Sequence, residues 1–149
     1  MHPEVEKYWE QAERIHNEIF KWSEGLSDER LNWRPPGEDT NTLGNLMSHI
    51  MGGQFFSIVE RVGGVTTNRD RTSEFRNPVT RNWLVERRAE VERRIRETLD
   101  KLTPADLGRV LKTQAGEMTV DKWLANVLSH FSGHMGQGIL TRKLLNAQK

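Results

Sequence analysis

The sequence contains no cysteine among its 149 residues. This absence excludes disulfide bonds, thiolate metal ligands and a thiol nucleophile, and it fits a reducing compartment, so we expect a cytoplasmic protein. No apolar run approaches the ~20 residues of a transmembrane helix, and the N-terminus lacks the apolar core of a signal peptide. The sequence therefore predicts no membrane insertion.

The sequence also lacks an excess of charge of one sign, because it contains 22 Lys and Arg residues and 21 Asp and Glu residues. Without a net field, the composition indicates no nucleic-acid or membrane partner. The densest charged segment, residues 87–97, interleaves arginine with glutamate. That pattern is more typical of a solvated helix face than of a DNA-binding surface. A chain of this length is expected to form one domain, residues 1–149.

Apolar residues recur at helical spacing in four segments. These segments are residues 4–23, 40–61, 79–102 and 120–146. Residues 27–31 and 103–107 are predicted to be capped turns, and residues 110–118 a short extended excursion. Residues 63–77 are polar and non-periodic, so we expect a long loop there, with a lid as a second interpretation. The pattern predicts an all-α fold, a four-helix bundle with a long loop between its second and third helices.

Two of the five histidines, His130 and His134, lie four residues apart in the last predicted helix. Positions i and i+4 share one face of a helix, and this is the spacing of the paired histidines in zinc-binding helices. Gln137 falls on nearly the same line. The pair therefore suggests two metal ligands, for which a third is still needed.

An internal repeat supplies the third candidate, His49. Residues 43–53 and 124–134 share Leu, Asn, Ser, His and Gly at equivalent positions, so His49 aligns with His130. The repeat suggests that two helices each point a histidine at the same place. Three imidazoles suit zinc, nickel, iron or copper, and three protein ligands leave a position for water or substrate. A single histidine beside an apolar helix face is more often a hydrogen-bonded residue of the core or its boundary than a metal ligand, so the interpretation depends on the three histidines together.

Glycines lie next to these histidines. Gly52 and Gly53 fall inside the second predicted helix, where each glycine costs roughly 1 kcal/mol relative to alanine. Either close approach of a neighbouring helix or clearance for a ligand beside His49 would offset that cost. His16 adjoins the apolar face of the first helix, so it lies either at the surface or toward the bundle interior.

These motifs resemble the DinB/YfiT-like family of small metal-binding four-helix bundles, which includes bacillithiol and mycothiol S-transferases. The resemblance rests on residues 26–35, 42–49, 119–124 and 130–137. It implies a bundle of up-down-down-up order and a homodimer. It also implies a divalent ion, zinc or nickel with iron or manganese as alternatives, held by His49, His130 and His134.

The activity implied by the resemblance is metal-dependent transfer of a small thiol to an electrophile. On this hypothesis Asn45 and Gln137 orient ligands or water, while Trp33 and Phe56 line the electrophile pocket. The alternative is a non-catalytic protein whose ion stabilises the fold or senses stress. No carboxylate has the helical spacing expected of a general base, which argues against a hydrolase. The sequence also contains no Ser-His-acid set, phosphate loop or dinucleotide fingerprint.

Overall fold

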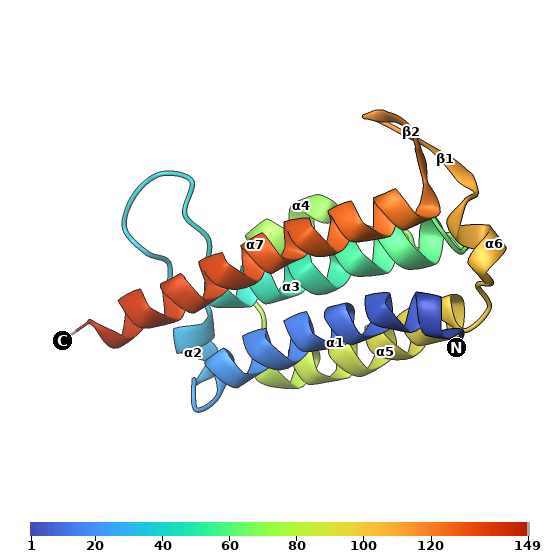
Figure 1. The fold of residues 1–149 in the computed structure, drawn as a ribbon. Coiled ribbons are helices and arrows are strands. Elements are labelled where there is room, and N and C mark those ends of the chain that lie inside the picture. Colours follow the sequence, from blue (N-terminus) through green and yellow to red (C-terminus); the bar gives the residue numbers. More distant parts are fainter. Residues whose placement is uncertain (149) are drawn as a thin grey trace.

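Over residues 1–148, which the computed structural model describes, four long helices form the bundle (Figure 1). They are α1 (Pro3–Ser23), α3 (Leu43–Gln54), α5 (Arg81–Leu99) and α7 (Val120–Asn146), and the π-helix η1 (Phe55–Glu60) continues α3. Helices α1 and α7 run in one direction and α3 and α5 in the other. The predicted all-α fold and its up-down-down-up order are confirmed.

The helix starts follow from side-chain capping. Thr42, Thr80 and Thr119 each have extended backbone and accept a hydrogen bond from the N–H three residues further on. Such caps satisfy donors that the first helical turn leaves free. Apolar residues of all four helices then meet in one buried cluster, which includes Ile15, Met47, Ile95 and Leu124.

The shorter connections contain local structure. Two single turns, α2 (Asp28–Leu31) and α6 (Pro104–Leu107), lie where capped turns were predicted. The strands β1 (Val110–Thr113) and β2 (Gly116–Thr119) form an antiparallel hairpin in the predicted extended excursion. Gly116 has φ 104°, a left-handed conformation that glycine adopts readily in the hairpin turn. Figure 1 shows this hairpin projecting beyond the start of α7.

The prediction of a plain loop over residues 63–77 is wrong in part, because α4 (Arg71–Arg76) forms within it. Asp70 begins the helix by accepting a hydrogen bond from the Ser73 N–H. Helix α4 packs against α3, and its one buried side chain is Glu74. A helix that buries a single charged residue has no apolar stripe, which is why the sequence pattern did not reveal it.

No helix within residues 1–148 has the length and apolar character needed to cross a membrane.

Candidate metal centre

Three histidines meet where α3 packs against α7. His49 comes from α3, and His130 and His134 come from successive turns of α7. One nitrogen from each ring lies within 4.8 Å of the others. The structure therefore brings together all three residues that the repeat and the four-residue spacing indicated, and the group could hold a metal ion.

The spacing of the two α7 nitrogens suits a small divalent cation. The Nε2 atoms of His130 and His134 are 3.0 Å apart. In a tetrahedral site with metal–nitrogen distances of about 2.0–2.1 Å, neighbouring nitrogens lie about 3.3 Å apart. Two imidazole lone pairs at such a separation repel each other unless a proton or a cation lies between them. The donor set therefore fits a metal ion.

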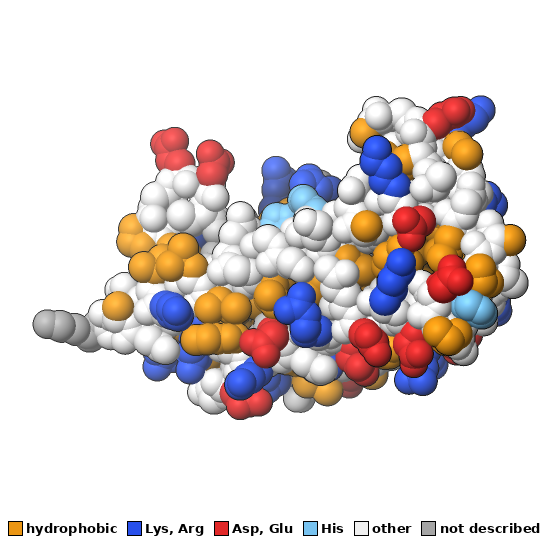
Figure 2. Space-filling view, viewed as in Figure 1, with side chains coloured by type: hydrophobic (Ala, Val, Ile, Leu, Met, Phe, Trp, Pro, Cys, Tyr) orange, Lys and Arg blue, Asp and Glu red, His pale blue; other side chains and the backbone are white. Residues whose placement is uncertain are grey.

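The centre is closed on one side and open on the other. His49 is only 3% exposed, whereas His134 is half-buried and His130 is exposed. Figure 2 shows histidine side chains reaching the surface at the upper edge of α7, with Lys or Arg side chains beside them. An ion bound here would have protein ligands on its buried side and space for another molecule on its outer side.

Glu74 on α4 fixes the orientation of His49. Its Oε2 lies 2.8 Å from His49 Nδ1, and Arg69 donates to both carboxylate oxygens, at 2.7 and 2.8 Å. A carboxylate that accepts the Nδ1–H leaves the Nε2 lone pair for a metal ion. Glu74 and Arg69 were missed from the sequence because both lie in the segment that was predicted to be a loop.

Gly52 and Gly53 make room for the side chains around His49. A Cβ at Gly52 would lie 2.1 Å from Glu74 Oε1, and one at Gly53 would lie 2.0 Å from Phe131 Cζ. The Phe131 ring in turn lies 5.5 Å from the His49 ring, centre to centre. The cost of the two glycines is thus offset by close approach of α4 and α7, the first of the two predicted reasons. Of the two glycines, Gly52 was the signal in the sequence that pointed to Glu74.

The surroundings favour the neutral form of His49 and of His130, and the ionised form of Glu74. Burial lowers the pKa of His49, although Glu74 acts in the opposite sense. Burial also lowers the pKa of His130, and nearby His134, His49, Arg71 and Arg69 lower it further. Burial alone would raise the pKa of Glu74, but hydrogen bonds from Arg69 and His49 prevail and lower it. Neutral imidazole is the form that binds metal ions.

The other predicted site residues lie in different places. Gln137 contacts the centre, because its Oε1 lies 2.7 Å from His134 Nδ1. Asn45 instead donates to the Asn77 carbonyl at 3.0 Å and so ties α3 to the segment before α5. Trp33 packs against the apolar core directly after α2.

Phe56, on η1, lines a cavity of about 560 Å³ that also includes Trp123. A second cavity of about 330 Å³ shares Trp123 and is lined by His130 and Phe131. The Trp123 indole is held in place because its Nε1 donates to the Ser57 carbonyl at 3.0 Å. Trp123 therefore lines both cavities, and the smaller one lies beside His130 on the open side of the centre.

His16 takes no part in the centre. It is fully buried between α1 and α5, where its Nδ1 lies 3.1 Å from Glu92 Oε1. Of the two positions considered for it, the interior is correct, and there it acts as a core histidine with a carboxylate partner.

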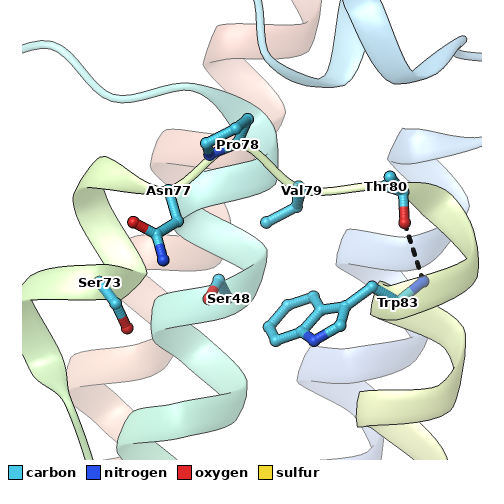
Figure 3. A pocket seen from close by; sticks show the side chains of 7 residues that line it. All are labelled: Ser48, Ser73, Asn77, Pro78, Val79, Thr80 and Trp83. Atoms are coloured by element: carbon cyan, nitrogen blue, oxygen red, sulfur yellow. Dashed lines mark hydrogen bonds between the residues drawn. The ribbon is translucent and has the colours of Figure 1, made fainter.

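A further cavity, of about 320 Å³, is lined by residues of α3, of α4 and of the start of α5. Figure 3 shows the Trp83 indole pointing across it toward Ser48, with Ser73 and Asn77 opposite. None of the three histidines lines it. It is therefore separate from the metal centre.

The chain is thus an all-α bundle with an open group of three histidines that could hold a metal ion. The chain belongs to the DinB superfamily, whose sequence model matches residues 11–137. No curated protein matches the sequence.

Two solved structures share the fold. The first is a conserved protein from Enterococcus faecalis, with a TM-score of 0.77 at 15% identity, covering 99% of this chain and 100% of that one. The second is a DinB-like protein from Bacillus cereus, with a TM-score of 0.75 at 18% identity, covering 95% of this chain and 92% of that one. At these identities the likeness establishes the fold.

Proposed function

We propose that this protein is a metal-dependent S-transferase that joins a low-molecular-weight thiol to an electrophile. The observation that carries the proposal is the one-sided exposure of the centre, from His49 at 3% exposed to the exposed His130. An ion held by His49, His130 and His134, zinc or nickel with iron or manganese as alternatives, would supply Lewis acidity that favours the thiolate form of a bound thiol.

The residues around the centre favour transfer over hydrolysis. The nearest carboxylate, Glu74, is 6% exposed, and both of its oxygens already accept hydrogen bonds from Arg69 and His49. Because it is buried and engaged at both oxygens, it is poorly placed to deprotonate an attacking water. A thiol activated at the centre needs no such base, because it attacks as the thiolate.

Neighbouring side chains would orient the metal-binding imidazoles and contact the electrophile during the reaction. Glu74 and Gln137 each accept from an imidazole Nδ1–H, which points the Nε2 atoms of His49 and His134 inward. Phe56 and Trp123 offer apolar surface beside the open position for the electrophile. The proposal includes a homodimer and assigns no nucleic-acid or membrane partner.

Thiol consumption by the metal-loaded protein tests the proposal. Wild type and His134→Ala would be incubated with 1-chloro-2,4-dinitrobenzene and a panel of small thiols that includes cysteine, coenzyme A and bacillithiol. We expect metal-dependent product formation that His134→Ala loses while its circular dichroism stays helical. If no thiol supports turnover and His134→Ala lowers only the melting temperature, the ion is structural and the non-catalytic alternative holds.

A further inference from the structure

The cavity of about 560 Å³ beside the metal centre has a positively charged lining. It lies between η1, α4, the β1–β2 turn and the start of α7. Arg61, Arg69 and Arg71 all line it, and no carboxylate does. A cavity lined by guanidinium groups and by no carboxylate attracts anions, provided that carboxylates outside the lining do not neutralise those groups.

Two of the three arginines retain their charge for a ligand. Arg69 is neutralised by Glu74, on which its guanidinium makes two hydrogen bonds. Within residues 1–148, Arg61 and Arg71 form no salt bridge. Glu60, which precedes Arg61, accepts hydrogen bonds from the Thr67 N–H and hydroxyl, both at 2.8 Å, and these lower its pKa more than the nearby Arg61 charge does.

Aromatic rings hold these two guanidinium groups in place. Arg61 lies 5.1 Å from the centre of the Phe56 ring, and Arg71 lies 5.2 Å from that of Phe75. The Phe75 ring is itself 4.4 Å from the His49 ring. Stacking orders each guanidinium and leaves its N–H groups available to a carboxylate.

The same cavity also offers apolar surface that leads toward the metal centre. Phe56 and Trp123 lie on its walls. Trp123 and Ala115 also line the smaller cavity, which His130 borders. A molecule anchored at the arginines can therefore extend past Trp123 toward the open side of the centre.

We propose that this cavity binds an organic anion, a substrate that carries a carboxylate or similar group on a flat apolar body. Arg61 and Arg71 bind the anionic group, Phe56 and Trp123 contact the body, and the reactive end faces His130. This substrate class rests on the proposed transferase function, because it assigns one of the two substrates to the space beside the ion. Guanidinium groups suit the task because their paired N–H donors match the two oxygens of a carboxylate.

Calorimetric titration with 2-naphthoate tests the proposal, with 2-naphthamide as its uncharged counterpart. We expect naphthoate to bind metal-loaded protein at least about tenfold more tightly than naphthamide, the ratio that one charge-assisted hydrogen-bonded contact provides. Arg61→Gln and Arg71→Gln should each weaken naphthoate binding several-fold, and added salt should weaken it further. Arg76→Gln, an exposed arginine on the same helix as Arg71, is the matched control and should bind as wild type does.

Because a carboxylate can also bind a metal ion directly, the titrations are repeated with metal-free protein. This control distinguishes the contribution of the arginines to naphthoate binding from that of the ion. We expect the difference between wild type and Arg71→Gln to persist in metal-free protein. Equal binding of naphthoate and naphthamide, no binding of naphthoate, or binding that depends on the ion and not on the arginines would overturn the anion site. Each of these results leaves the transferase proposal standing, because that proposal fails only on metal uptake and turnover.

Discussion

The Glu74 carboxylate occupies the space that a side chain at position 52 would fill. Only glycine at that position lets α4 lie close enough to α3 for Glu74 to reach His49, since a Cβ there would sit 2.1 Å from Oε1. Gly52 and Glu74 therefore act together: the glycine lowers helix propensity in α3, but it leaves the space in which Glu74 orients His49.

Gly52→Ala should therefore weaken metal binding without unfolding the bundle. The added methyl pushes Glu74 away from His49, and loss of such a supporting contact typically costs 10–100-fold in metal affinity, so we expect about that range. Competition with a fluorescent chelator measures the effect.

Gly136→Ala provides the matched control, because a Cβ at Gly136 meets nothing within 4 Å. It lies in α7 next to the same centre, so alanine should stabilise the helix by up to about 1 kcal/mol and leave the affinity unchanged. If both variants lose affinity equally, the contact with Glu74 is not what matters at position 52.

Glu74→Gln should lower metal affinity by a similar factor of about 10–100. The amide keeps the size of the side chain but removes the charge that His49 and Arg69 both contact. Because Gly52→Ala acts through the same contact, the double variant should be little worse than either single one, which is the mark of strongly coupled positions. Additive losses would show that Gly52 and Glu74 act independently.

Glu92 should make the bundle sensitive to acid at a position remote from the metal centre. Burial favours its neutral form, but hydrogen bonds from His16 and Arg88 prevail and lower its pKa below 4.5. A carboxylate whose pKa is lower in the folded state stabilises the protein above the unfolded value and loses that effect as pH falls through the folded value.

The free energy of unfolding of wild type should therefore fall more steeply below pH 4.5 than that of Glu92→Gln. Urea unfolding of metal-free protein at a series of pH values from neutral to acid measures both curves. Parallel curves across that range would mean that Glu92 contributes nothing to the acid sensitivity.

The helices and site residues that could be predicted from sequence are those that recur at regular spacing along the chain. Apolar spacing predicted the four long helices, and the repeat together with the four-residue spacing singled out His49, His130 and His134. Gln137 contacts His134 because a three-residue step on a helix brings side chains together.

The parts that could not be predicted depend on contacts between segments distant in sequence. Glu74 reaches His49 across 25 residues, from a helix with no apolar stripe. Asn45 has an equivalent in the repeat, yet its side chain bonds to the Asn77 carbonyl, a partner that only the packing of the chain supplies.

The most direct test of the account is the metal content of protein purified without a chelator or an affinity tag. Elemental analysis would compare wild type with His49→Ala, and with His2→Gln as a control, since His2 is an exposed histidine at the start of α1. We expect about one divalent ion per chain in wild type and His2→Gln, and loss of that ion in His49→Ala. Wild-type protein that holds no ion even after zinc or nickel is offered would contradict it.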